Sequence, residues 1–298
     1  MPLTFPTTSL KKPSGVTALP SGLKRPAFGT LYGFDAQGGA SALTDQLAYP
    51  GGLFTSSNFE VSVQPLFHFD GSILDGASAD NNPSNGTAVS TWGDRSGQSA
   101  NYDASQSTAS QQPIFQGNNV IFGGAPTGAQ NDFLEIATKT DNVDGTGWTL
   151  CVVANKVETS GGAKREYAPV GRHPLQNAYY LPLNFRNGVT YYFVGNSSVS
   201  TAGYGPHFES IQQFVTIKDT SDDATYYLQG NNAYKTGVHV TNGPSGLFGN
   251  IGHNGYYHYG PIYEVILWGS TLSTADLNVV RTYFNTKYTD LPSSTAFS

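Results

Sequence analysis

The most constraining feature of the sequence is a segment near the C-terminus that is apolar on both faces of an expected strand. In residues 261–268, large apolar side chains occupy both the even-numbered and the odd-numbered positions, and Glu264 is the exception. Successive side chains of a strand point to opposite faces, so neither face of this segment is suited to water. Such a strand belongs in the middle of a packed sheet.

A short helix is expected directly after this strand. Ser273 is a suitable N-cap, and Asp276 is a shorter version of the acid in a capping box. Leu272 stands where a hydrophobic staple to the first helical turn forms. Apolar residues then recur at a spacing close to 3.6 residues, at Leu277, Val280, Phe284 and Tyr288. The pattern predicts a C-terminal helix that packs its apolar face on the sheet.

The composition favours an all-β protein with many short strands. The 298 residues include 35 Gly and 17 Pro, and only 12% are charged, which suits strands joined by tight turns. A net charge of −6 gives no reason to expect nucleic-acid binding. No apolar run approaches the ~18 residues of a membrane span. The first residues lack the apolar core of a standard signal peptide.

Residues 1–58 differ from the rest of the chain. They hold six prolines, and all their basic residues precede the first acid, Asp35. One interpretation is a flexible, solvated leader. The other is an extended arm that docks on protein subunits of a larger assembly, since apolar residues accompany the basic ones. The candidate docking residues are Lys11, Lys12, Lys24, Arg25, Phe28 and Tyr32.

Residues 59–292 have the pattern of a β-sandwich, and residues 293–298 form a tail. Strand-like segments occur at 61–70, 120–124, 132–136, 148–156, 178–185, 189–194, 214–218 and 225–229. Asn187-Gly188 between two of them is a strong hairpin signal. The absence of a repeat with a fixed period argues against a propeller or a solenoid. We therefore expect an antiparallel two-sheet jelly-roll sandwich with one short C-terminal helix and an extended N-terminal arm.

Several motifs resemble the LamG-like, concanavalin A-like lectin-glucanase jelly-roll family. An opening strand ends in Phe69-Asp70, and W-x-D-x-S-G follows at 92–97, with Gln112-Pro113 and an F-x-G…D-x-L pair downstream. Residues 260–288 contain G-x-I-x-E-V-I-L-W, L-S-x-A-D and Y-F-x-x-K-Y. The resemblance covers roughly residues 60–290 and implies two antiparallel sheets packed face to face. It implies no single function, since the family includes lectins, adhesion modules, glycosidases and viral structural domains.

Glycoside hydrolysis is the enzymatic reaction to consider, and it needs two carboxylates about 5 to 9 Å apart across a cleft. Sandwich glycosidases usually supply them from one strand as Glu-x-Asp-x-x-Glu, a pattern that is missing here. Glu264 and Glu60 are solitary, and Asp132 and Glu135 would point to opposite faces of a strand. Cys151 lies in an apolar run and is expected to be a buried, inert thiol. We therefore predict that the chain is not an enzyme and that Glu264 is a buried acid with a structural partner.

Two loops offer candidate binding residues. Asp70, Asp75 and Asp80 lie in an oxygen-rich loop of a kind that can hold Ca²⁺, although solvated turn chemistry explains the same residues. No other cofactor is expected. The loop 252–259 combines aromatic faces with hydrogen-bonding groups, as sugar sites do. Its candidate glycan or partner contacts are His253, Asn254, Tyr256, Tyr257, His258 and Tyr259. The alternative is that its tyrosine rings pack on the sandwich.

Three classes of function follow from the sequence. The first is a non-catalytic structural or interaction module, present in many copies or as a homo-oligomer and displayed on a larger assembly by the arm. The charge-poor, Gly- and Tyr-rich composition resembles that of phage or viral virion proteins, such as capsid decoration or tail-fibre proteins. That analogy predicts a location on a virion or extracellular surface. The second class is a carbohydrate-binding, lectin-like domain, and the third is a glycosidase or lyase.

Overall fold

The computed structural model describes fifteen stretches of the chain, all within one compact unit, Leu47–Ser298. They are residues 61–77, 81–98, 102–123, 132–137, 147–155, 166–171, 181–186, 189–194, 197–200, 211–221, 223–228, 235–239, 248–252, 258–292 and 296–297. The predicted arm at 1–58 and its six docking residues lie outside these stretches. The domain boundaries at 58 and 292 therefore stay predictions.

The first sheet is antiparallel and is built around β16 (Gly260–Trp268). Its strand order in the described residues is β14-β13-β12-β7-β16-β5-β4, and β1 pairs with the C-terminal part of β16. The other strands are β14 (Lys235–His239), β13 (Asp223–Leu228), β12 (Gln212–Lys218), β7 (Trp148–Ala154), β5 (Val120–Phe122), β4 (Ile114–Phe115) and β1 (Phe67–Asp70). The prediction that residues 261–268 form an interior strand is confirmed.

The second sheet is also antiparallel and has the order β11-β10-β9-β8-β15-β6-β3-β2. Its strands are β11 (Ser197–Ser200), β10 (Val189–Val194), β9 (Leu181–Arg186), β8 (Glu166–Gly171), β15 (Asn250–Ile251), β6 (Leu134–Ile136), β3 (Ala104–Ser105) and β2 (Thr91–Trp92). β9 and β10 pair through Arg186 and Val189, so residues 187–188 connect them as predicted. A 3-10 turn, η3 (Ala109–Gln111), precedes β4. The predicted all-β, two-sheet sandwich is confirmed.

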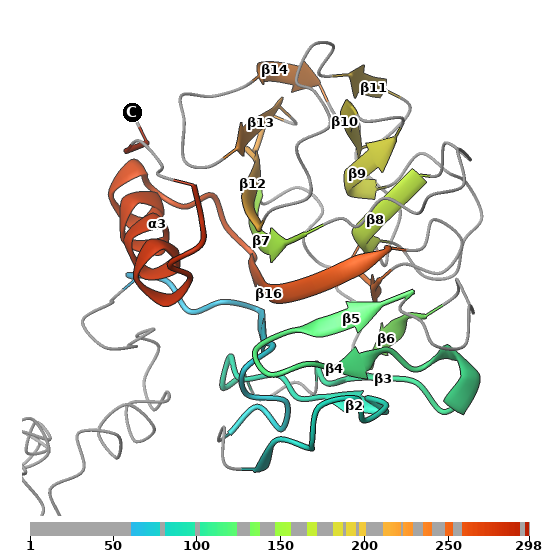
Figure 1. Ribbon diagram of the computed structural model, residues 1–298. Coiled ribbons are helices and arrows are strands. Elements are labelled where there is room, and N and C mark those ends of the chain that lie inside the picture. The colour runs from blue at the N-terminus through green and yellow to red at the C-terminus, as the bar shows by residue number, and fades with distance from the viewer. Residues whose placement is uncertain are drawn as a thin grey trace, which may run out of the picture. The chain divides into compact units, whose positions relative to one another are not determined.

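Two separate cores lie on the two faces of the first sheet. The inner core fills the space between the sheets and includes Phe67, Phe69, Trp92, Trp148 and Phe248. The outer core lies between the first sheet and α3 (Thr274–Lys287). Figure 1 shows α3 on one side of β12, β7 and β16, with β8 and β9 of the second sheet on the other side. β16 is apolar on both faces because it contributes to both cores.

The C-terminal helix forms as its sequence predicts. The Ser273 Oγ accepts a hydrogen bond from the Asp276 backbone N–H at 3.1 Å, which caps the helix. The Asp276 carboxylate also accepts hydrogen bonds from the backbone N–H and the hydroxyl of Ser62, so it ties the start of the described chain to the helix. The predicted stripe is buried in the outer core, at Leu277, Val280, Phe284 and Tyr288.

Register in the first sheet places polar residues opposite one another on the face that α3 covers. One row across β12, β7, β16 and β1 consists, in that order, of Gln213, Val153, Glu264 and Asp70. The next row on the same face consists of Val215, Cys151, Ile266 and His68. Cys151 is fully buried with a free thiol, as predicted, and burial raises its pKa. His68, Asp70, Cys151 and Glu264 thus lie beneath the helix.

The short strands of the lower half of the sandwich in Figure 1 were the least predictable part of the fold. The expected strand at 61–70 is shortened to β1, and β2, β3 and β4 have only two residues each. Stretches this short have no measurable periodicity, so the sequence gives them no signal. The described part of the chain contains no helix that is long and apolar enough to cross a membrane.

The docked helix gives a first prediction. Leu277→Asp or Phe284→Asp places a carboxylate in the outer core, where both residues are buried. We expect a loss of several kcal/mol, a large part of a typical stability of about 5–15 kcal/mol. Thr282→Asp on the exposed side of the same helix is the matched control. The measurement is the free energy of urea unfolding, and equal values for Phe284→Asp and Thr282→Asp would show that the helix is not docked.

Candidate functional site

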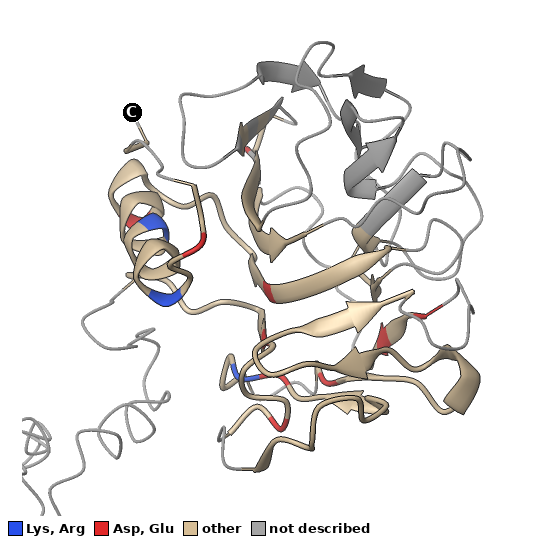
Figure 2. Cartoon of the chain, in the orientation of Figure 1, with Lys and Arg blue, Asp and Glu red and all other residues tan. Residues whose placement is uncertain are grey.

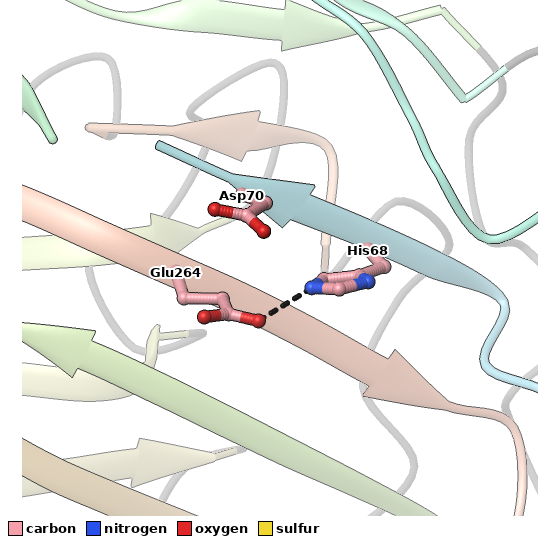
Figure 3. Close-up of side chains that lie close together, drawn as sticks. All are labelled: His68, Asp70 and Glu264. Carbon is pink, nitrogen blue, oxygen red and sulfur yellow. Dashed lines mark hydrogen bonds and ion pairs between the residues drawn. The ribbon is translucent and has the colours of Figure 1, made fainter. Parts of the chain in front are cut away.

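Among the described residues, several ionisable side chains gather around Glu264, which is fully buried on β16. Pairing of β1 with β16 places Asp70 opposite Glu264 and His68 opposite Ile266. Figure 3 shows His68, Asp70 and Glu264 turned toward one another, with the His68 Nε2 2.5 Å from the Glu264 Oε1. Residues almost two hundred positions apart thus meet because two strands pair, which no local pattern reveals.

Helix α3 supplies the remaining partners of this carboxylate. The Tyr283 hydroxyl donates to the Glu264 Oε1 at 2.8 Å, and the Tyr288 hydroxyl donates to Oε2 at 2.7 Å. The Lys287 Nζ donates to the same Oε2 at 2.7 Å. With His68, each carboxylate oxygen has two hydrogen-bond partners. The buried charge is therefore neutralised and fully hydrogen-bonded, as a charge removed from water requires.

Lys287 joins Glu264 to a second buried carboxylate. Its Nζ lies 2.7 Å from the Asp70 Oδ2 and 3.0 Å from the Tyr283 hydroxyl, so its three N–H groups all have acceptors. The Arg95 guanidinium contacts the same Asp70 oxygen at 2.5 Å. The Ser72 backbone N–H and hydroxyl donate to the Asp70 Oδ1. We call His68, Asp70, Arg95, Glu264 and Lys287 the ionic cluster.

The pKa values within the ionic cluster show which groups carry charge. Burial pushes the pKa of Glu264 upward, but Lys287 and the hydrogen bond from His68 outweigh this effect, so the pKa lies below its ordinary value. Burial also opposes ionisation of Asp70, and Lys287 and Arg95 more than compensate and lower its pKa. Burial lowers the pKa of His68. A neutral imidazole then donates its Nε2–H to an ionised Glu264.

The position of Lys287 decides whether His68, Asp70 and Glu264 can bind a metal ion. His68, Asp70 and Glu264 offer ligand atoms that all lie within 4.8 Å of one another, a grouping that suits a metal ion. The Lys287 ammonium, however, contacts both carboxylates at 2.7 Å and supplies the positive charge that an ion would bring. The donor set does not fit a metal with that lysine in place. The prediction that Glu264 is a buried acid with a structural partner is confirmed.

The W-x-D-x-S-G motif contacts the strand that carries His68 and Asp70. The Trp92 indole N–H donates to the Asp70 carbonyl at 3.1 Å, and Asp94 accepts from the His68 backbone N–H at 2.7 Å. The Ser96 hydroxyl donates to the other Asp94 oxygen. The motif therefore fastens the loop after β2 onto β1. The sequence signalled the motif, and its hydrogen bonds explain the spacing of its residues.

The predicted calcium ligands do not come together in the described residues. The Asp70 carboxylate belongs to the ionic cluster, and Asp80 lies outside the described stretches. Asp75 is exposed, and its carboxylate accepts hydrogen bonds from the Ala77 backbone N–H and the Asn81 side chain. That is the turn chemistry given as the alternative interpretation.

Two members of the predicted 252–259 contact set can be placed. His258 is fully buried, its Nε2 lies 3.1 Å from the Asn155 carbonyl oxygen, and its ring stands edge-on to Phe122. Tyr259 packs against the inner core. Both fit the packing alternative, so the assignment of His258 as a surface contact is corrected. His253, Asn254, Tyr256 and Tyr257 lie outside the described residues, and their role stays a prediction.

A groove of about 460 Å³ opens beside β2, at one end of the strand order of the second sheet. Its polar lining comes from β2 and from the loops on either side of it and consists of Asp75, Asn81, Thr87, Ser90, Thr91 and Asp103. Leu74, Pro83 and Val89 add apolar surface. This volume lies within the range of small-molecule binding sites, about 300–1,000 Å³. We call it the β2 groove.

Close backbone packing builds one wall of the β2 groove. The Gly93 N–H donates to the Leu74 carbonyl at 2.6 Å, and a Cβ at Gly93 would lie 2.5 Å from the Asp75 carbonyl group. Only glycine allows this approach of the two loops. The groove could not be predicted from the sequence, because its lining residues are mostly ordinary loop residues with no spacing of their own. Gly93 within the W-x-D-x-S-G motif was the one available signal.

Comparisons with known proteins place the fold and not the family. No family model and no curated protein matches the sequence. Among solved structures, a Trypanosoma rangeli sialidase in complex with 2,3-difluoro-KDN matches with a TM-score of 0.52, 12% identity and 80% of this chain covered. The same sialidase with the inhibitor DANA gives 0.51 and 14%. The chain spans 36% of the sialidase chain in both cases. Identities this low establish a shared β-sandwich fold only, so membership of the LamG-like family stays a prediction.

The prediction that the chain is not an enzyme is contradicted by these matches. The structures are sialidases, which are glycosidases, so the fold occurs within glycosidase chains. The prediction was drawn from a missing one-strand pattern of acids. The ionic cluster shows why that reasoning was too narrow: Asp70 and Glu264 meet from strands far apart in sequence. Acids need not share a strand to share a site.

A second prediction concerns coupling within the ionic cluster. Lys287→Met leaves two buried carboxylates without their shared cation, and we expect a loss of about 3–5 kcal/mol in the free energy of unfolding. Glu264→Gln in the same chain removes one of the carboxylates that Lys287 neutralises. The double variant should therefore lose at least about 1 kcal/mol less than the sum of the single losses. Thr286→Met, exposed on the same helix, is the control, and strict additivity would contradict the coupling.

A third prediction concerns pH. His68 has a lowered pKa, so below its ordinary value of about 6.5 the unfolded chain binds the proton and stability falls. Burial raises the pKa of Asp132, which is 4% exposed, to about 6. Between about pH 6 and 4 its folded state therefore binds more protons, and stability rises as the pH falls. The two effects oppose each other in the parent protein.

Single substitutions separate the two titrations. Asp132→Asn keeps an acceptor for the Gly123 N–H and should make the acid-induced loss of stability steeper. His68→Gln keeps a donor for Glu264 and should make it shallower. The measurement is the urea midpoint from pH 7.5 to 4.5. If Asp132→Asn leaves the slope unchanged, the carboxyl is not protonated in this range.

Proposed function

We propose that this β-sandwich is a lectin-like module that binds carbohydrate in the β2 groove. The observation that carries the proposal is the groove's lining of hydroxyl, amide and carboxylate groups around a limited apolar surface. Sugars present many hydroxyl groups, each of which both donates and accepts hydrogen bonds. Such ligands need several polar partners at fixed positions together with some apolar contact.

The framework around the groove supports this proposal by holding the lining in place. Asp75 is held by its bonds to Ala77 and Asn81, and Asp103 accepts from the Asp94 backbone N–H at 2.8 Å. Groups fixed in this way lose little conformational entropy when a ligand binds. The two carboxylates of the ionic cluster, in contrast, are buried and ion-paired, so they serve the fold.

A fourth prediction tests the β2 groove directly. Ser90 is exposed and lines the groove, so Ser90→Tyr should fill part of it and weaken glycan binding at least tenfold without changing the unfolding midpoint. Ser107→Tyr places the same ring on an exposed position outside the lining. Binding is measured on a glycan array and then by calorimetry with the best neutral oligosaccharide. Equal affinity in the two variants would remove the groove from the proposal.

The presentation of this module on a larger assembly is the second part of the proposal. It is supported by the prolines and basic residues of 1–58, because prolines reduce the entropy lost when a segment is pinned in an extended form. The predicted virion or extracellular location and the multi-copy arrangement rest on the same sequence features.

A fifth prediction addresses this attachment. Deletion of residues 1–34 from the protein in its parent assembly should abolish incorporation, while circular dichroism and the melting temperature of the sandwich stay unchanged. The salt dependence of assembly should fall when Lys11 and Lys12 alone are replaced by Gln. Incorporation of the truncated protein at the normal level would place attachment in the sandwich.

A further inference from the structure

The tail of the chain returns to α3 and is held there by one asparagine. Phe297 is only 4% exposed and belongs to the outer core, although Ala296 before it is exposed. The Phe297 backbone N–H donates to the Asn278 Oδ1 at 2.8 Å, and its carbonyl accepts from the Asn278 Nδ2 at 3.1 Å. These tail residues lie beside α3, near the chain end marked C in Figure 1. One side chain thus pairs with both backbone groups of a tail residue.

The Asn278 amide is positioned by its own helix. Its Nδ2 also donates to the Thr274 carbonyl, one turn earlier, at 3.0 Å. A carboxamide has the donor and the acceptor of a peptide group, so it pairs with an extended backbone as a neighbouring strand does. These two hydrogen bonds need only a backbone N–H and a carbonyl, which every residue except proline offers. Asn278 therefore recognises an extended segment and not a particular side chain.

The ring of Phe297 adds selectivity for an aromatic residue. It stands edge-on to the ring of Tyr227 on β13, with the ring centroids 4.8 Å apart and the planes at 78°, a favourable geometry for two aromatic rings. An aliphatic side chain would lose this contact. Figure 2 shows the described tail residues in tan, because neither is charged. We call the surface formed by Tyr227 and Asn278 the tail site.

The segment that carries Phe297 is longer than its path back along the helix requires. Asn278 lies about 15 Å from Tyr288 along the helix axis, while residues 289–297 can extend about 30 Å. The segment can therefore also reach the tail site of a neighbouring copy whose helix lies alongside. Two copies of one chain carry the same segment and the same site, so an exchange between them keeps every contact.

We infer that the tail site is a peptide-binding site that accepts the Phe297 segment of a second copy of this chain. In dilute solution the chain's own tail occupies the site, since a short linker gives an effective concentration on the order of millimolar. An assembly that holds many copies side by side brings neighbouring tails to comparable concentrations. That setting rests on the proposed multi-copy display, whereas the site itself is independent of glycan binding in the β2 groove.

The first experiment empties the site and adds the segment back. Phe297→Ala in the full chain removes the ring, and a fluorescein-labelled peptide of residues 293–298 is titrated by anisotropy. We expect a dissociation constant on the order of 0.1–1 mM, since one buried ring and two hydrogen bonds must offset the entropy lost on association. The parent chain should bind the peptide at least fivefold more weakly, because its own tail competes. A peptide with the same Phe297→Ala change should also bind at least fivefold more weakly.

A matched pair of helix variants then locates the binding. Asn278→Arg, added to the Phe297→Ala chain, should weaken peptide binding at least fivefold, because arginine has no acceptor for the Phe297 N–H. Thr286→Arg places the same charge at an exposed position of the same helix and should leave the affinity unchanged.

The second experiment tests exchange between copies. The Asn278→Arg chain keeps its tail but has an impaired site, and the Phe297→Ala chain keeps its site but has lost the ring. At about 0.5 mM of each, which is comparable to the expected dissociation constant, the mixture should form pairs. Sedimentation should then give a weight-average mass at least about a fifth higher than for either variant alone.

Peptide binding that needs both the ring and Asn278, together with association in the mixture, supports the inference. If the folded Phe297→Ala chain does not bind the peptide, or binds it equally well after Asn278→Arg, the inference is overturned. A mixture that does not associate also overturns it, because the site then accepts only its own tail. If Phe297→Ala does not fold, Phe297→Leu keeps most of the apolar volume and serves as the host under the same criteria. Glycan binding is measured separately, so failure here leaves the proposed carbohydrate-binding function standing.

Discussion

The buried charge of Glu264 is the constraint on which the arrangement of sheet and helix depends. An isolated carboxylate in a protein interior costs several kcal/mol even after relaxation, and this one is fully buried in the middle of a sheet. In place of water, its carboxylate has hydrogen-bond donors from β1 (His68) and from α3 (Tyr283, Lys287 and Tyr288). The helix can therefore dock in one register only, because a shift by one turn would leave the charge without its partners.

The same interaction links the two ends of the described chain. β1 lies near its start and α3 near its end, and both contact Glu264 through hydrogen bonds from His68 and Lys287. Apolar packing in the outer core supplies attraction without direction. The ionic cluster adds direction, because hydrogen bonds and ion pairs tolerate only narrow ranges of distance and angle. This division of roles is consistent with the use of buried polar groups to specify one packing arrangement, a hypothesis that the coupling measurement addresses.

Whether a feature of this fold could be predicted from the sequence depends on how far apart in the chain the interacting residues lie. The capped helix and the interior strand β16 were predictable, because capping and periodicity are local and Ser273, Leu277 and Phe284 carry them within one segment. The hairpin at 187–188 was predictable for the same reason. The ionic cluster was only half predictable. The isolation of Glu264 in an apolar strand indicated that it needed a partner, but its partners are set by strand pairing and helix docking.

The β2 groove was the least predictable feature, because it is formed by loops and two-residue strands. Its shape depends on the contact between Gly93 and the Leu74–Asp75 backbone, and no property of threonine, serine or aspartate in a loop signals that contact. The prediction for His258 in the loop 252–259 was wrong for a different reason. A rich local composition drew attention to His258, whose ring is in fact buried against Phe122. Composition identifies residues capable of binding, while burial decides which of them meet a ligand.

The acids of this sandwich consequently fall into two groups with opposite tasks. Asp70 and Glu264 are charged and inaccessible, and their charges are matched by Lys287 and Arg95. Asp75 and Asp103 line an open groove and accept hydrogen bonds from the loops around it. A carboxylate beside solvent keeps most of its hydration, so its charge costs the fold little. A buried carboxylate loses that hydration and depends on its partners. Carbohydrate recognition by this fold is therefore expected at the groove, and stability at the helix that covers the opposite face of the first sheet.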